Sequence, residues 1–202
     1  MSQLDNPVIR FFTPPARLLA IVSGWWMLAL SFLTCVEIVL RKFFSMSIQG
    51  IDEIGAYTLA IVSAFGFASA LMVKAHTRVD FLVGRLPAFL RALLNATAYV
   101  LLAAMAGYAA WRGWAVLDES IEFQAHANSP LQTPLWIPQS AWLAGIGLFA
   151  AASGAMAAHA VLLLLFSWRQ VNRFYGPLTL DEEIETEVSA LKQRGGAEGA
   201  GA

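Results

Sequence analysis

The sequence predicts an all-α integral membrane protein with four transmembrane helices, on the basis of its composition and its hydropathy pattern. Hydrophobic residues make up 58% of the 202 residues and charged residues only 13%, which is too apolar for the surface of a water-soluble domain. Four runs carry few or no charges, at residues 18–40, 54–73, 92–111 and 135–168. Each run can cross a bilayer, because a helical span needs about 20 apolar residues.

The first two spans are expected at about residues 18–40 and 52–74. The first run is longer than the hydrophobic region of a signal peptide, about 7 to 15 residues, and no cleavage-like site follows before Arg41, so we expect a retained helix. Asp52 and Glu53 stand where the second helix would begin. Negative charge at that position suits the positive end of the helix dipole.

The third and fourth spans are expected at about residues 88–116 and 139–167, joined by a polar loop. Pro87 can open the third helix, since proline is well tolerated at a helix start. Pro134 and Pro138 near the start of the last run suggest either a kinked entry or an extramembrane lead-in before a tilted helix.

Two further elements are predicted outside the spans. Asp80 can cap a short interfacial helix between helices 2 and 3, over residues 81–86. Residues 177–202 follow the transmembrane domain, residues 1–176, as a cytoplasmic tail, in which Thr179 and Glu182 have the spacing of a capping box and indicate a C-terminal helix.

Basic residues indicate the orientation, because Lys and Arg near span ends are retained on the cytoplasmic side. If the helices alternate in direction, the 13 basic residues divide ten to three between the two sides. The first side holds Arg10, Arg17, Lys74, Arg78, Arg85, Arg91, Arg169, Arg173, Lys192 and Arg194, and the second holds Arg41, Lys42 and Arg112. Both termini are therefore expected in the cytoplasm.

Charged residues near the span ends are the candidate site residues. Glu37 and Arg41 are four residues apart on one helical face and can pair, either as an interfacial ion pair that fixes helix depth or as a buried contact to another helix or subunit. His76 and Asp80 have the same spacing just past helix 2. The far-side loop begins with three further acidic residues, Asp118, Glu119 and Glu122.

Several classes of function find no support in the sequence. The net charge of −1 gives no basic excess for nucleic acid. The lone Cys35 excludes an intrachain disulfide and any multi-cysteine metal site. Of the three histidines only His159 lies inside a span, where we expect a helix-packing hydrogen bond and not a haem or metal ligand. No grouped catalytic residues or Walker-type motif are present, so no enzyme activity, cofactor or metal is expected.

Small residues recur on three of the predicted helices and favour close helix association. We weigh internal packing above partner contact for any one of them. They are Ala60, Ala64, Gly66 and Ala68 on helix 2, Ala103, Ala106, Gly107 and Ala110 on helix 3, and Gly145, Gly147, Ala151, Gly154 and Ala158 on helix 4.

Several short stretches, in their order and spacing, resemble one transporter family. They are Arg41-Lys42-Phe43-Phe44, Gly50-Ile51-Asp52-Glu53, Ala75-His76-Thr77-Arg78-Val79-Asp80, Leu86-Pro87, Thr133-Pro134 and Trp136-Ile137-Pro138. Together they are similar to the small, DctQ-type membrane subunit of tripartite ATP-independent periplasmic (TRAP) transporters, over about residues 37–142. One departure is Ile51, where a Trp commonly precedes the acidic pair.

The resemblance implies a bacterial inner-membrane subunit bound to a large membrane subunit that carries an organic acid with sodium. A periplasmic solute-binding protein would deliver the substrate. On this interpretation Glu37, Arg41, Asp52, Glu53, His76 and Asp80 hold the ends of the bundle or contact the large subunit. Asp118, Glu119 and Glu122 would lie near the binding protein, and sodium would bind in the large partner. The remaining partners would be membrane lipids.

Two alternatives stay open at this point. A membrane-anchor subunit of a respiratory enzyme would show paired histidines within its spans. A free-standing small transporter or channel would need a central acidic residue or a polar pore stripe.

Overall fold

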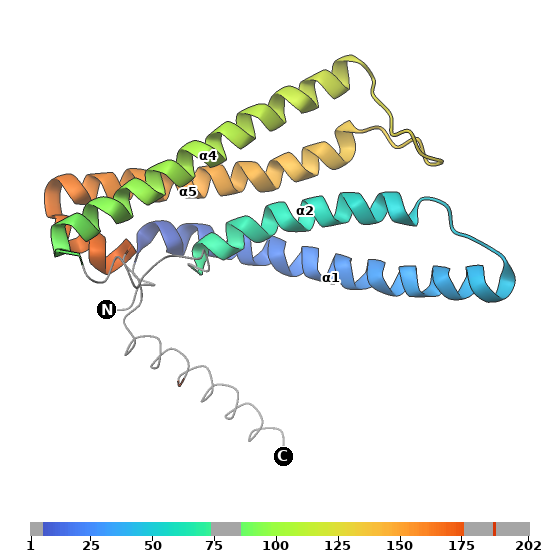
Figure 1. The fold of residues 1–202 in the computed structure, drawn as a ribbon, viewed down its shortest axis with the longest axis horizontal. Helices are drawn as coiled ribbons and strands as arrows, with labels where there is room; N and C mark the ends of the chain where they lie inside the picture. Colours follow the sequence, from blue (N-terminus) through green and yellow to red (C-terminus); the bar gives the residue numbers. More distant parts are fainter. Residues whose placement is uncertain (1–5, 74–85, 176–187, 189–202) are drawn as a thin grey trace.

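The computed structural model describes residues 6–73 and 86–175, together with Val188, and its described part is built from helices. Figure 1 shows four long helices arranged as two hairpins, α1 with α2 and α4 with α5. All four are long and apolar enough to cross a membrane. The predicted interfacial helix, apart from Leu86, and the predicted tail with its C-terminal helix, apart from Val188, lie outside the described residues.

Helix α1 covers Pro7–Phe44 and therefore starts well before the predicted span. Asn6 caps its start by accepting a hydrogen bond of 3.1 Å from the backbone N–H of Val8, which satisfies one of the free N–H groups of the first turn. Ser45 ends the helix in a left-handed conformation with φ 52°. In the apolar window of α1 only 6% of the residues are buried within the chain.

Helix α2 covers Ile51–Met72 and lies against both α1 and α5. Its Ala64 and Ala68 are fully buried. A Cβ added to Gly145 on α5 would lie 2.8 Å from the Cβ of Ala64, so the two helices approach too closely for a larger residue. Other small residues face open space, because a Cβ added to Gly66, Gly107, Gly147 or Gly154 would meet nothing within 4 Å.

Helices α4, Ala88–Glu122, and α5, Trp136–Tyr175, make the most extensive contact of the fold. Helix α5 breaks at Ser167, where φ is −158° and ψ is 63°. On a straight helix 16 residues would separate His159 from Tyr175 by about 24 Å, yet the His159 ring nitrogen Nδ1 lies 2.7 Å from the Tyr175 hydroxyl. The last turns of α5 therefore fold back on the bundle, as Figure 1 shows at the red end of the helix.

Both described connections lie at one end of the bundle, which we call the loop end; it holds residues 45–50 and 123–135 (Figure 1). The opposite end, the terminal end, holds the start of α1 and the end of α5. There Ile9, Val171 and Tyr175 are buried in the core of the fold. The terminal end is therefore packed by buried, largely apolar side chains.

Candidate functional site at the loop end

Polar side chains from three segments meet at the loop end and form what we call the loop-end cluster. It draws on the end of α1 with the connection that follows it, the start of α2, and the connection between α4 and α5. Its members are Glu37, Arg41, Ser47, Asp52, Glu53 and Ser129, which all line one hollow of about 290 Å³. Four of the six are among the charged residues that the sequence singles out.

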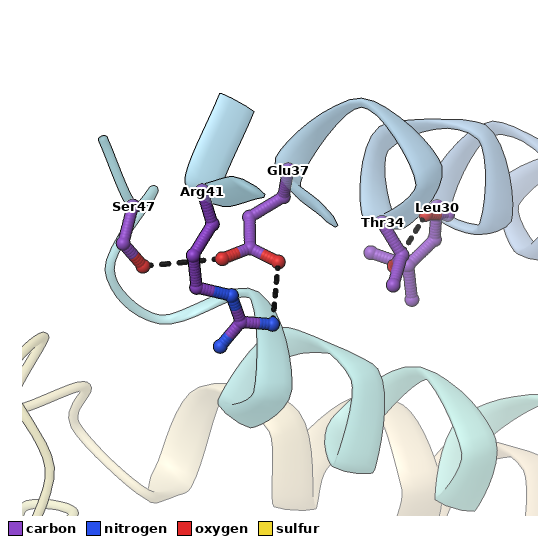
Figure 2. Close-up of polar contacts among 5 residues, drawn as sticks. All are labelled: Leu30, Thr34, Glu37, Arg41 and Ser47. Atoms are coloured by element: carbon purple, nitrogen blue, oxygen red, sulfur yellow. Dashed lines mark hydrogen bonds and ion pairs between the residues drawn. The ribbon is translucent and has the colours of Figure 1, made fainter. Parts of the chain in front are cut away.

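Glu37 is the buried member of the cluster, with a side chain only 7% exposed. Figure 2 shows two donors reaching its carboxylate, the Arg41 guanidinium at 3.2 Å and the Ser47 hydroxyl at 3.1 Å. A buried carboxylate needs such partners, because its desolvation is otherwise costly. The pairing expected from the four-residue spacing is thus present, and Ser47 adds a bond from the α1–α2 connection.

Arg41 itself is 61% exposed, although it binds a buried partner. A pair four residues apart on one helix, with its Arg side exposed, stabilises by only about 0.3 to 0.5 kcal/mol. One turn before Glu37, Thr34 donates to the carbonyl of Leu30 at 2.9 Å and takes no part in the cluster (Figure 2). On α1, the residues that take part in the loop-end cluster are therefore Glu37 and Arg41, in the last two turns of the helix.

Glu53 links the first turn of α2 to the distant α4–α5 loop. Its carboxylate accepts hydrogen bonds from the Tyr57 hydroxyl at 2.8 Å and from the Ser129 hydroxyl. Thr133 approaches the same carboxylate with its side chain and its backbone. Ser129 is 76 residues away in sequence, so this contact joins the two helical hairpins at the loop end.

Gly50 allows the same loop to pack closely on the start of α2. Its φ is +89°, and a Cβ added to it would lie 1.4 Å from the Cδ1 atom of Leu131. Only glycine fits here, because the backbone is left-handed and the space is already filled by Leu131. The loop is therefore held against the start of α2 by an apolar contact, Leu131 on Gly50, and by a polar contact, Ser129 with Glu53.

The hollow has an acidic character. Three carboxylates, those of Glu37, Asp52 and Glu53, line it together with the single guanidinium of Arg41. Asp52 is exposed and makes no side-chain hydrogen bond or ion pair with any described residue. Within the described part of the chain, no three His, Cys, Asp or Glu side chains are grouped as a metal site would require. The arrangement can hold hydrogen-bond donors and fix the loops that contribute them.

The remaining predicted site residues lie elsewhere. Asp118, Glu119 and Glu122 are exposed on the last turns of α4. They share the loop end with the cluster but do not line its hollow. His76 and Asp80 fall outside the described residues.

Sequence reasoning did not find the hydroxyl donors of the cluster. Ser47, Tyr57 and Ser129 carry no motif, and only the fold brings Ser129 to Glu53. The sequence offered only a weak indication of these contacts. Gly50 stands just before the acidic pair Asp52 and Glu53, and the polar loop at residues 123–135 is long enough to reach that pair. The sequence predicted a helix-packing hydrogen bond for His159 but did not identify its partner, Tyr175.

Comparison with known families gives the remaining finding. Residues 16–174 match the family described as tripartite ATP-independent periplasmic transporters, DctQ component. No curated protein and no solved structure matches the chain. The matched region contains all of α2 and α4, α1 from Ala16 onward, and α5 up to Phe174. Because the match covers well over half of the sequence, the chain belongs to the DctQ family, the small component of TRAP transporters.

Proposed function

We propose that this chain is a non-catalytic scaffold subunit of a TRAP transporter that takes up an organic acid with sodium. In this role it steadies the large transport subunit and helps to form the docking surface for the periplasmic binding protein. The observation that carries the proposal is the distribution of charge. No Asp, Glu, Lys or Arg occurs within residues 18–36, 54–72, 92–111 or 136–168.

A carrier that couples ions to a solute places polar or charged groups near the bilayer midplane. The centres of these spans carry no Asp, Glu, Lys or Arg, so sodium and substrate are assigned to the large partner, and this chain needs no cofactor of its own. Its part is mechanical, since four packed helices can widen and stiffen a frame against which another subunit moves.

The exposed apolar surface of α1 supports a membrane partner. Within the chain, the side chains of Trp25, Phe32 and Phe43 are each more than 70% exposed. Surface of this kind is stable only when lipid or another membrane protein covers it. A scaffold bound on one side and lipid-facing on the other meets that requirement.

The ten-to-three division of basic residues supports an inner-membrane orientation with both termini in the cytoplasm. The loop end then faces the periplasm. Asp118, Glu119 and Glu122, exposed on α4, would present negative charge beside the docking site of the binding protein.

Reconstitution tests this proposal. The chain is purified alone and together with the large membrane protein with which it co-purifies, and uptake into liposomes is measured with the binding protein and a sodium gradient. We expect uptake only from the complex. Solute flux by the chain alone would contradict the scaffold role, and so would full uptake by the large protein without this chain.

A further inference from the structure

The α4–α5 loop, residues 123–135, is a folded element and not a slack connection. Its two arms are joined by backbone hydrogen bonds from Ala127 to Thr133, 2.9 Å, and from Leu135 to Ala125, 3.0 Å. His126 and Pro134 form an antiparallel bridge between the same arms. Figure 1 shows the loop extending beyond the ends of α4 and α5. Its shape is therefore set internally, but internal bonds alone leave its orientation open.

The orientation is set from outside, by the first turn of α2. Glu53 accepts from Ser129 at the tip of the loop and is approached by Thr133 on the returning arm. Between them Leu131 packs over Gly50. Because three points along one loop arm contact the same turn of another hairpin, the loop has little freedom to pivot.

The fixed loop presents a mixed surface of the kind that proteins use for recognition. Phe123 is 71% exposed, and His126, Asn128 and Pro130 of the same loop are also exposed. Aromatic groups of this kind are enriched in protein interfaces, where hydrogen-bonding groups surround them. A loop held by a rigid scaffold is also where binding residues concentrate, because less conformational entropy is lost on association.

We propose that Glu53 is a positioning residue that holds the 123–135 loop in the orientation to which the periplasmic binding protein docks. The α1–α2 hairpin then sets the affinity of a surface that it does not itself form. The inference rests on the proposed function, which assigns the loop end to the periplasm. The complementary surface on the binding protein is cationic, because the adjoining end of α4 carries Asp118, Glu119 and Glu122, all exposed.

The test combines loop mobility with docking affinity in the same full-length protein. A nitroxide is attached at Asn128→Cys, with Cys35→Ala removing the only native thiol. Its mobility is recorded by electron paramagnetic resonance in lipid nanodiscs, for the chain alone and for the complex with the large subunit. The dissociation constant of the binding protein for the complex is measured in parallel, without the label.

Glu53→Gln and Ser129→Ala are the test variants, and Ser63→Ala is the matched control. The control makes the same chemical change as Ser129→Ala, at an exposed serine of α2 whose hydroxyl donates only to the carbonyl of Leu59 in its own helix. We expect both test variants to mobilise the nitroxide and to weaken docking by about tenfold, as expected for a lost hydrogen bond to a charged group. The double variant should be no weaker than the stronger single one, because both remove the same contact. Ser63→Ala should change neither quantity.

Two results would overturn the inference. One is nitroxide mobility in Glu53→Gln and Ser129→Ala equal to that in Ser63→Ala, which would remove Glu53 as the residue that holds the loop. The other is a mobile loop with unchanged docking affinity, which would remove the loop as the docking surface. Failure to recover a complex with a large membrane subunit would instead count against the scaffold function, since mobility is also measured on the chain alone.

Discussion

The two ends of the bundle are held by different interactions. At the terminal end Asn6, Ile9, Val171 and Tyr175 are at most 4% exposed, and the rings of Tyr175 and Tyr99 meet edge to face with centroids 4.8 Å apart. At the loop end the contacts are carboxylates with hydroxyls and with an exposed guanidinium. Buried apolar surface contributes far more stability than exposed ion pairs. The contrast indicates that the terminal end contributes more to the stability of the fold than the polar contacts of the loop end do.

The largest effect should come from Tyr175→Ala at the terminal end. The substitution removes a fully buried aromatic ring together with its contacts to Tyr99 and His159. Truncating a buried aromatic residue typically lowers the free energy of unfolding by about 3 to 5 kcal/mol. Denaturation in mixed micelles measures this, with Tyr108→Ala as the control, because Tyr108 is 55% exposed on α4. Equal losses in both variants would contradict the assignment of stability to the terminal end.

A smaller loss is expected at the seam that joins the two hairpins. Gly145→Ala places a Cβ 2.8 Å from Ala64 Cβ and 3.1 Å from backbone atoms of Ala64 and Phe65. Overpacking of this kind costs about 1 to 3 kcal/mol. Gly147→Ala is the control; its Cβ meets nothing within 4 Å, so it should be neutral or slightly stabilising. The same micelle denaturation checks both, and a stable Gly145→Ala variant would show that the seam is loose.

The amide contacts at the terminal end should contribute less to the free energy of unfolding than the aromatic contacts do. Asn172 donates to the carbonyl of Ala88 at 2.7 Å and accepts from Asn95 at 3.3 Å. Asn172→Ala leaves the buried Asn95 amide without this acceptor, so we expect a loss of about 1 to 2 kcal/mol in the free energy of unfolding. If the pair acts as a unit, Asn95→Ala combined with Asn172→Ala will lose less than the sum of the two single variants. Additive losses would show that the two amides act independently.

The smallest change in stability is expected for Arg41→Ala at the loop end. Its guanidinium is 61% exposed, and the buried Glu37 carboxylate keeps its hydrogen bond from Ser47, so the free energy of unfolding should fall by only about 0.5 kcal/mol. Uptake by the reconstituted transporter should nevertheless drop while membrane insertion is retained, because Glu37 loses a donor beside the hollow. The neighbouring Lys42→Ala is the control, since Lys42 forms no ion pair with any described residue. Unchanged uptake in Arg41→Ala would remove Arg41 from the functional residues.

Local rules were sufficient for much of the fold and for part of the site. The four long apolar helices follow from hydropathy, and the Glu37–Arg41 pair follows from four-residue spacing on a helix. The break at Ser167 falls at the end of the predicted fourth span, but the sequence around it contains neither proline nor glycine. No local rule therefore predicts that α5 turns back there. Contacts such as Glu53 with Ser129 join residues 76 positions apart, and only the packing of the hairpins determines them.

By itself, the sequence determined that this protein has four helices able to cross a membrane, with charged groups near their ends. The order and spacing of its short motifs also resemble those of a TRAP small subunit. These properties depend on local hydrophobicity and on the cost of placing charge in lipid, both of which a linear sequence reports. The tertiary structure alone decided which small residues face a neighbouring helix, and which carboxylate holds the distant loop. Those outcomes depend on the approach and rotation of whole helices, which are set by packing summed over many residues and not by any one segment.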